Sequence, residues 1–444
     1  MNTPIYDFVT QYAHKSGIRL HMPGHKGKGD TERLDITEIE GADSLYEASG
    51  IIYESEQNAG SLFGADTFYS AEGSSLSIRA AMYLISLYAR SIGKKPSILA
   101  ARNAHKTFIS AVSLIDLQVN WIYPKCSSYL SCEACAEDIE AHLKECKEKP
   151  TALYITSPDY LGNILDIKAI SDICHKYGVL LVVDNAHGAY LKFLPTSMHP
   201  IDLGADICCD SAHKTLPVLT GGAYLHISKN APKIFKESAK EALSLFGSTS
   251  PSYLILASLD RANAYLSGDY KERLERFVGV IERIKERLKA SGHTLHGSEP
   301  LKITLKTKPY GYYGYEMAKI LEEKGIFPEF SDPDFLVLML TPEISDMELF
   351  KMTHALVTTP QKAPIEEKSP DFFIPKVRMS PREAMLCEKE TVELDRTLGK
   401  TLGAVTVGCP PAVPILVMGE IIDENAIECF KYYGANRLRI IKEV

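Results

Sequence analysis

Two motifs in the middle of the chain each place reactive side chains directly after a run of apolar residues. Asp184 and His187 follow the run 179–183 in VVDNAHG, and Lys214 follows the run 207–209 in SAHKTLP. Such continuous Val, Leu and Ile runs are typical of parallel strands buried on both faces. Ligands of open α/β sheets bind at the carboxyl ends of the strands, so we expect these three side chains to converge at one edge.

An aspartate, a histidine and a lysine together match the needs of a pyridine aldehyde cofactor. A partly desolvated lysine at a strand end can form a Schiff base with the aldehyde. A carboxylate keeps the pyridine nitrogen protonated, which makes the ring an electron sink, and His187 can orient that carboxylate. Taken alone, Lys214 would be interpreted as a surface lysine in a loop, but the paired motifs favour the cofactor.

Two further motifs could complete the binding of such a cofactor. Gly73, Ser74 and Ser75 begin a helical pattern, and backbone N–H groups with two hydroxyls at a helix start suit a phosphate. Simple capping of the helix by serine is the alternative. His105 follows the apolar run 97–100 and could stack on the ring, although a histidine satisfied within the core or a loop remains the alternative.

Two patterns that could indicate metal binding carry little weight. His21 and His25 are four residues apart, but they lie in a glycine-rich loop without a carboxylate ligand nearby. Cys132 and Cys135 form a CxxC without a second pair, within an expected helix over 132–149. We therefore expect no metal site.

The elements that must position these residues alternate between strands and helices from about residue 60 to 230. This alternation predicts a mostly parallel sheet with helices on both sides. Expected helices include 75–91 and 167–177. Expected strands are 97–100, 121–123, 153–155, 179–183, 207–209 and 223–227.

The second half of the chain has a different pattern. A long charged helix is expected over 270–290, with apolar residues at helical spacing, and its mixed charges favour a solvated face over nucleic-acid binding. Ser380, Pro381 and Glu383 form a capping box that should open a helix through about residue 398. The expected segments are an N-terminal arm (1–35), a large cofactor domain (36–265), a small α+β domain (266–358), a Pro-rich linker (359–376) and a helical and loop region (377–444).

Composition excludes several classes of protein. The 444 residues include 49 Lys+Arg and 57 Asp+Glu, so the net charge is −8, which argues against a nucleic-acid partner. Hydrophobic residues make up 45% of the chain, as in ordinary globular proteins. Ten cysteines without a regular frame fit a reducing compartment, and no signal peptide or membrane span is expected, which predicts a cytoplasmic location.

Taken together, the motifs resemble those of the Orn/Lys/Arg decarboxylase family, pyridoxal 5'-phosphate enzymes of the aspartate-aminotransferase fold type (fold type I). The resemblance implies an α/β fold: a three-layer α/β/α large domain with a mostly parallel seven-stranded sheet, and a smaller α+β C-terminal domain. The resemblance runs from HMPGHKG at 21–27 to PPAVPILVMGE at 410–420 and predicts the short form, without an N-terminal receiver-like domain. Two departures are Gly221-Gly222, where many relatives have Gln, and 409–414, which differs from the usual Tyr-Pro-Pro-Gly-Ile-Pro. The motifs that carry the resemblance are ARNAHKT, TSPDYLGNILDI, VVDNAHGAYLKF, DSAHKTLP, STSPSYLILASLD and SPREA.

The resemblance implies a role for each candidate residue. Lys214 corresponds to the Schiff-base lysine, Asp184 to the partner of the pyridine nitrogen with His187 beside it, and His105 to the stacking histidine. Thr249 would reach the phosphate of a neighbouring subunit, which implies a homodimer or larger homo-oligomer with shared sites. Glu420, near the entrance, is a candidate partner for the distal cation of the substrate. The phosphate binders would be Gly73, Ser74, Ser75, Ser211 and His213.

The predicted function is decarboxylation of arginine, lysine or ornithine, feeding polyamine metabolism, with arginine slightly favoured. An aminotransferase or lyase of the same fold is one alternative. A catalytically silent protein that retained the fold is another, although the retained lysine and aspartate argue against it.

Overall fold

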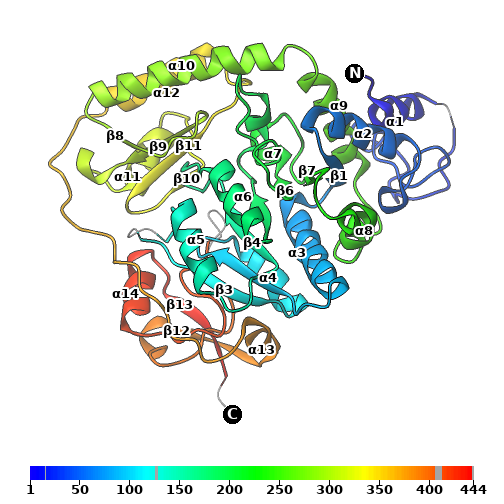
Figure 1. The fold of residues 1–444 in the computed structure, drawn as a ribbon. Helices are drawn as coiled ribbons and strands as arrows, with labels where there is room; N and C mark the ends of the chain where they lie inside the picture. Colours follow the sequence, from blue (N-terminus) through cyan, green and yellow to red (C-terminus); the bar gives the residue numbers. More distant parts are fainter. Residues whose placement is uncertain (16, 126–128, 406–412, 443–444) are drawn as a thin grey trace. The chain divides into compact units, whose positions relative to one another are not determined.

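A computed structural model describes residues 1–15, 17–125, 129–405 and 413–442 (Figure 1). The chain divides into two compact units. Unit 1 comprises Met1–Ser97, Glu140–Tyr154 and Ile167–Glu275, and unit 2 comprises Ile98–Ile139, Ile155–Asp166 and Arg276–Val444.

The predicted seven-stranded sheet is present, with strand order β1-β7-β6-β5-β4-β2-β3. Its strands β5 and β6 pair in parallel, whereas β7 is antiparallel to both β6 and β1. The sheet confirms the α/β fold class. The strands are β1 (Asp66–Ser70), β2 (Ser97–Ala101), β3 (Gln118–Ile122), β4 (Ala152–Thr156), β5 (Leu180–Asp184), β6 (Ile207–Asp210) and β7 (Ala223–Ile227).

Helices pack on this sheet because their apolar faces match its buried strands. Within unit 1, α3 contacts β1, β6 and β7, while α6 contacts β5. Both α3 and α6 fall where the sequence predicts helices. The helices from the N-terminus to the end of unit 1 are α1 (Pro4–His14), α2 (Ile51–Phe63), α3 (Gly73–Ser91), α4 (Lys106–Ile115), α5 (Ala136–Glu145), α6 (Ile167–Lys176), α7 (Ala212–Thr215), α8 (Lys233–Ser244) and α9 (Tyr253–Leu266), with short 3₁₀ turns η1 (Leu45–Glu47) and η2 (Ala189–Phe193).

Unit 2 contains a four-stranded antiparallel sheet of order β10-β11-β9-β8. Figure 1 shows α10 and α12 side by side next to this sheet. The expected helix over 270–290 is confirmed by α10. These elements are α10 (Tyr270–Ala290), β8 (Thr294–His296), β9 (Lys302–Lys306), η3 (Lys308–Tyr310), α11 (Gly314–Glu322), β10 (Phe330–Ser331), β11 (Phe335–Met339) and α12 (Asp346–Val357).

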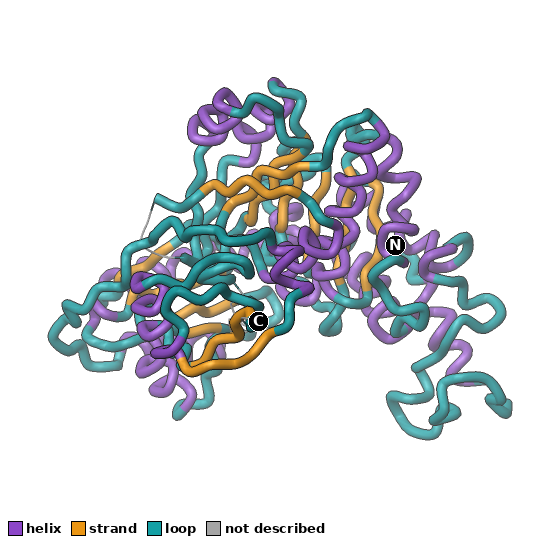
Figure 2. The backbone as a smooth tube through the Cα atoms, turned by 90° about the horizontal axis from the view of Figure 1, so that it is seen from below, coloured by secondary structure: helices purple, strands orange, loops and turns teal. Residues whose placement is uncertain are grey.

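The C-terminal segment departs from expectation. The capping box of Ser380 and Glu383 is present, but its helix α13 (Pro381–Leu386) ends twelve residues before the expected position at 398 (398 − 386 = 12). The chain instead forms β12 (Lys389–Glu393), which pairs with β13 (Arg437–Ile441) beside the C-terminus in Figure 2. β-Branched Thr391 and Val392 favour a strand, and Val392 lies opposite the buried Leu438. The remaining elements are η4 (Leu394–Arg396) and α14 (Glu424–Tyr432).

One smaller prediction also fails, and one strand has no counterpart among the expected strands. The helix expected over 132–149 extends only over Ala136–Glu145, so both cysteines of the CxxC pair precede it. Strand β1 was not predicted, because Asp66, Thr67 and Ser70 interrupt the apolar pattern of so short a segment. It lies at the edge of the sheet, where it pairs with β7. None of the described helices is both long and apolar enough to cross a membrane.

Candidate active site

Asp184 is the last residue of β5 and is buried, with 2% of its surface exposed. Its carboxylate accepts hydrogen bonds from the Tyr154 hydroxyl at 2.9 Å and from the Ala186 N–H at 3.2 Å. Burial raises the pKa of Asp184, while the Tyr154 hydrogen bond and the charge of Lys214 oppose that rise. The carboxylate is therefore held in a dry place where a cationic partner would stabilise it.

Lys214 and His187 meet beside this carboxylate. The Lys214 Nζ lies 3.0 Å from His187 Nε2, and the charge of Lys214 is felt at Asp184. His187 follows β5 and Lys214 lies in the single turn of α7 after β6, as the convergence of parallel strand ends requires. The structure thus brings the three residues of the first two motifs together. His187 contacts the lysine in this arrangement, and its orienting contact with the Asp184 carboxylate stays a prediction.

Ser74 and Ser211 form a pair of hydroxyls next to this group. Ser211 Oγ donates to Ser74 Oγ at 2.7 Å, and both serines are buried. The N-cap of α3 is Glu72, whose side chain makes no capping hydrogen bond, so Ser74 and Ser75 lie inside the first turn and do not cap the helix. This removes the simple capping interpretation and leaves a helix start with hydroxyls, as a phosphate site requires.

The turn that precedes α3 is tied to the segment before β7. Gly73 donates its N–H to the Gly221 carbonyl at 2.7 Å and has φ of 72°, a conformation that favours glycine. A side chain at Gly221 would meet the Ala71 carbonyl at 2.8 Å. The departure from the family at Gly221-Gly222 therefore coincides with close backbone packing next to the candidate phosphate site.

His213 is less open to an anion than expected. Its Nδ1 lies 3.0 Å from the Gly222 carbonyl, which can only accept, so Nδ1 carries the hydrogen. Burial lowers the pKa of His213, and the charge of Lys214 lowers it further. The hydrogen bond to the Gly222 carbonyl acts in the opposite direction and raises that pKa. In the neutral ring Nε2 is an acceptor, so a phosphate contact at Nε2 would require the protonated ring.

No contact described here links two further predicted residues, His105 and Thr249, to the candidate site. His105 belongs to unit 2, where it is the N-cap of α4 and its Nδ1 accepts the Thr107 N–H at 3.1 Å. Thr249 lies in an exposed stretch before α9. Their roles remain predictions.

Glu420 is buried in unit 2 and already has a cationic partner. Its Oε2 lies 2.7 Å from Arg102 Nη2 and also accepts the Val417 N–H at 2.6 Å. Both side chains are 3% exposed, so the carboxylate neutralises a buried arginine. This arrangement does not support Glu420 as an open partner for a substrate cation. Residues 406–412, which carry part of the 409–414 motif, lie outside the described part of the chain.

The two loop histidines bind protein groups. His21 Nε2 is 2.6 Å from the Tyr12 hydroxyl, and His25 Nε2 is 3.1 Å from Asp35 Oδ2. A different group of metal-capable side chains, which sequence reasoning missed, consists of the buried His199, Cys208 and Asp210. Tyr154 was missed as well. Its strand β4 is a continuous buried run, and the sequence alone does not give the strand order that places β4 next to β5.

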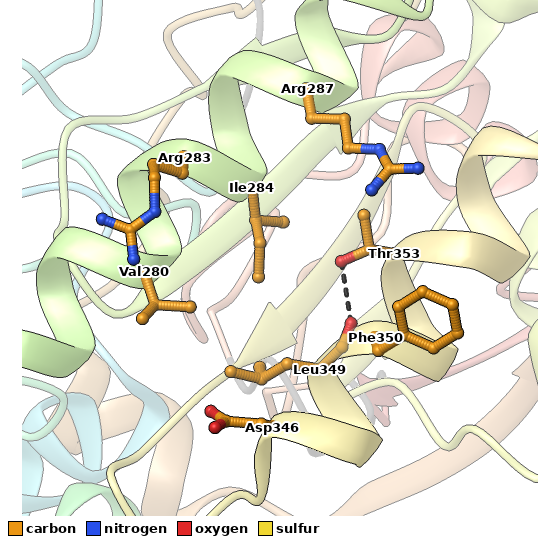
Figure 3. A pocket seen from close by; sticks show the side chains of 8 residues that line it. All are labelled: Val280, Arg283, Ile284, Arg287, Asp346, Leu349, Phe350 and Thr353. Atoms are coloured by element: carbon orange, nitrogen blue, oxygen red, sulfur yellow. Dashed lines mark hydrogen bonds between the residues drawn. The ribbon is translucent and has the colours of Figure 1, made fainter.

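A cavity of about 410 Å³ lies between α10 and α12 (Figure 3). Its apolar residues include Val280, Ile284 and Leu349, and Arg283 and Arg287 lie one helical turn apart on α10. None of the predicted site residues lines it. All of its lining residues belong to unit 2.

The donor set around Lys214 fits pyridoxal phosphate. An amine beside a histidine suits the aldehyde, a buried carboxylate suits the ring nitrogen, and two hydroxyls at the start of the 19-residue helix α3 suit the phosphate. Three chemically different needs are met by residues of one unit.

Comparison with known proteins gives the same result. The family model described as Orn/Lys/Arg decarboxylase, major domain, matches residues 3–307. The arginine decarboxylase of Bacillus subtilis (strain 168) is 28% identical over 491 residues, which cover 99% of this chain and 98% of that protein. Among solved structures, lysine decarboxylase A from Pseudomonas aeruginosa superimposes with a TM-score of 0.81 at 16% identity, covering 99% of this chain and 80% of that one.

The fold is also similar to that of an enzyme outside the decarboxylases. A serine palmitoyltransferase solved with pyridoxal phosphate has a TM-score of 0.56 at 15% identity, covering 71% of this chain and 79% of that one. The fold is thus shared with enzymes that use this cofactor, and the family model implies pyridoxal phosphate here. With two thirds of its length matched by the family model, the chain belongs to the Orn/Lys/Arg decarboxylase family and is an amino-acid decarboxylase.

Proposed function

We propose that the protein decarboxylates a basic amino acid, with arginine as the first candidate ahead of lysine and ornithine. The observation that carries the proposal is the contact of Lys214 with His187 beside the buried carboxylate of Asp184. The preference for arginine is supported by full-length relatives named arginine decarboxylase, from Bacillus subtilis and from Halalkalibacterium halodurans, the latter 29% identical and covering 95% of this chain.

Each residue of the cluster has a proposed task. Lys214 supplies the amine that binds the cofactor aldehyde, and Asp184 holds a proton on the ring nitrogen. Ser74, Ser75 and Ser211, with the start of α3, bind the phosphate, and His213 contributes through its protonated ring. His105 covers one face of the ring. When bound, pyridoxal phosphate supplies an electron sink for the bond to the departing carboxylate.

Proton transfer falls to the residues around the amine. His187 lies 3.0 Å from Lys214 Nζ, so the pair can share a proton between a neutral amine and a neutral ring. The burial of Asp184 and of the neighbouring strand ends excludes water from the ring nitrogen side. A dry site strengthens the attraction between the carboxylate and a protonated ring nitrogen.

Several finer points belong to the same proposal. The enzyme acts as a homodimer or larger homo-oligomer, with Thr249 reaching the phosphate of the neighbouring subunit, and its product amine feeds polyamine metabolism. A cytoplasmic location is supported by the eight described cysteines, all of which are free.

The test is release of carbon dioxide from a panel of arginine, lysine, ornithine and related diamino acids, with the amine product identified. The proposal expects one basic amino acid to give equimolar carbon dioxide and amine, and no keto acid. A keto acid as the main product would show an aminotransferase. Cofactor binding without turnover of any panel member would show a silent protein. The Lys214→Ala variant is the negative control, because it lacks the amine that is proposed to bind the cofactor.

A further inference from the structure

The strand that leads to Lys214 ends in a buried carboxylate, which has no task in the proposed chemistry. Asp210 is the last residue of β6, has no exposed surface, and is followed at once by Ser211 and, four residues on, by Lys214. It cannot touch substrate from this position. Its side chain, however, hydrogen-bonds to Asn185 in the turn that carries Asp184, and its backbone continues directly into the turn that carries Lys214.

The turn after β5, which carries Asp184 and His187, is linked to Asp210 through Asn185. Asn185, next to Asp184, donates its Nδ2 hydrogen to Asp210 Oδ1 at 2.7 Å, and its backbone N–H donates to the Cys209 carbonyl at 3.0 Å. Gly188 leaves room for this side chain, because a Cβ there would lie 2.0 Å from Asn185 Oδ1. The turn that carries Asp184 and His187 is therefore fastened to the end of β6.

The turn from Ser211 to Lys214 follows Asp210 directly along the chain, so the position of Asp210 determines where this turn begins. His199 Nε2 lies 3.0 Å from Asp210 Oδ2, and His226 Nε2 lies 3.3 Å from the same oxygen without the alignment of a hydrogen bond. Phe63 packs against both rings, at centroid distances of 5.4 and 4.4 Å. These contacts fix the carboxylate, and with it the start of the turn in which Ser211 donates to Ser74.

The chemistry of these contacts requires a carboxylate. Asp210 accepts from the Asn185 amide, the Cys208 thiol and His199, and an ionised carboxylate offers acceptor sites to all of them. An asparagine would turn one N–H donor toward another donor. Burial would raise the pKa of Asp210, but the charge and hydrogen bond of His199, together with His226, hold it below its usual range.

We propose that Asp210 is a positioning residue of the active site: through Asn185 and His199 it holds the Asp184 and Lys214 strand ends in the arrangement that pyridoxal phosphate requires. It acts on the cofactor only through these neighbours. The proposal rests on the cofactor that the family implies and not on the choice of substrate.

The test compares Asp210→Asn with Asp260→Asn in the full-length protein. Asp260 is a second carboxylate of unit 1 with no exposed surface; it accepts from Ile5, Tyr6 and Ser55 and lies outside the cluster. Two quantities are measured with pyridoxal phosphate: its dissociation constant, and the visible circular dichroism per bound cofactor, which reports how the ring is held. Apo-protein melting temperatures show the general cost of each substitution.

Asp210→Asn should weaken cofactor binding on the order of tenfold, by analogy with the loss seen when residues that hold metal ligands are replaced, and should reduce the dichroism per bound cofactor. Asp260→Asn should leave both at wild-type values. Equal changes in the two variants, or no change in Asp210→Asn, would overturn the proposal. If Asp210→Asn does not fold, Asn185→Ser removes only the link to the Asp184 turn; the same loss is expected, and wild-type values would overturn the proposal.

One competing role has a clear signature. His199, Cys208 and Asp210 place their ligand atoms within 4.8 Å of one another, as metal ligands do. An equimolar metal ion that survives dialysis against chelator in the wild type but is absent from Asp210→Asn would overturn the positioning role. Metal-free wild-type protein with tightly bound cofactor is the expected result.

Discussion

The Tyr154 hydroxyl, on β4, donates a hydrogen bond of 2.9 Å to Asp184 at the end of the neighbouring strand β5. Both side chains are buried. A hydrogen bond from a neutral phenol stabilises the ionised form of the carboxyl group, and it works against the burial that raises the pKa of Asp184. Tyr154 therefore helps to keep negative charge at the place where a protonated ring nitrogen needs it.

Tyr154→Phe should raise the pKa of Asp184 further. A hydrogen bond to a charged group is worth about 1.5–3 kcal/mol, so its loss makes the ionised carboxylate of Asp184 less favourable. Since less of the carboxyl is ionised at a given pH, the low-pH limb of decarboxylation should move upward in pH. The pH profile of kcat, measured on the best amino acid of the panel, checks this.

Tyr224→Phe is the matched control. Tyr224 is a buried tyrosine of β7, and its hydroxyl has no hydrogen-bond partner among the described residues. Its removal should leave the pH profile in place. An unshifted profile in Tyr154→Phe, or an equal shift in both variants, would contradict the assignment of Tyr154.

Lys214→Ala should abolish covalent attachment of pyridoxal phosphate. Without the amine no bond to the aldehyde can form and the proton shared with His187 is lost, so turnover should fall by at least about 100-fold, the lower end of acid–base contributions alone. Borohydride treatment followed by mass spectrometry measures the attachment. Lys236→Ala removes an exposed lysine of the same unit that pairs with Asp66, and it should retain both the added mass and the turnover. A Lys214→Ala protein with full turnover would sink the assignment.

Glu420→Ala should destabilise the protein strongly. It leaves the buried Arg102 guanidinium without its carboxylate, and breaking a buried ion pair costs about 3–5 kcal/mol. Replacing both partners, as in Arg102→Met with Glu420→Leu, should recover most of that loss because no lone charge remains. Thermal melting of the three proteins tests this. Equal melting temperatures for the single variant and the wild type would show that the pair is not needed.

The sequence predicts the cluster around Lys214 well because its residues follow strand ends. Buried Val, Leu and Ile runs mark β5 and β6, and parallel strands bring their carboxyl ends together whatever the loops do. Asp184, His187 and Lys214 could therefore be grouped from spacing and strand pattern alone.

Other parts of the site depend on contacts that no local pattern encodes. Tyr154 requires knowledge that β4 lies next to β5, and Asp210 requires its pairing with His199 through the folded core. No local sequence pattern indicates that the Glu420 carboxylate is buried against Arg102, which is 318 residues away along the chain. The failure at residues 387–398 has the same origin, since β12 is stabilised by pairing with β13 and the local capping box could not reveal that partner.

Asp260 provides a prediction on stability. Its carboxylate accepts the backbone N–H groups of Ile5 and Tyr6, at 2.9 and 3.0 Å, and so fastens α1 to α9. Burial raises the pKa of Asp260 to about 6, against 3.8 for an ordinary aspartate. Between these values the folded protein binds more protons than the unfolded chain, so the contribution of Asp260 to stability falls as pH rises from about 4 to 6.

The stability of the wild type relative to Asp260→Asn should therefore fall across that window and level off above it. The difference between the folded and ordinary pKa values, 6 − 3.8 = 2.2, sets an upper limit of roughly 3 kcal/mol on the change. Asp43→Asn offers a control of opposite sign. Burial alone would raise the pKa of Asp43, but hydrogen bonds from the N–H groups of Ser44, Ser49 and Gly50 hold that pKa below its usual value. Its contribution is present above the unfolded pKa and is lost as pH falls through the folded one. Melting temperatures of the three proteins from pH 3 to 7 should thus diverge in opposite directions, and a pH-independent difference between the wild type and Asp260→Asn would contradict the raised pKa.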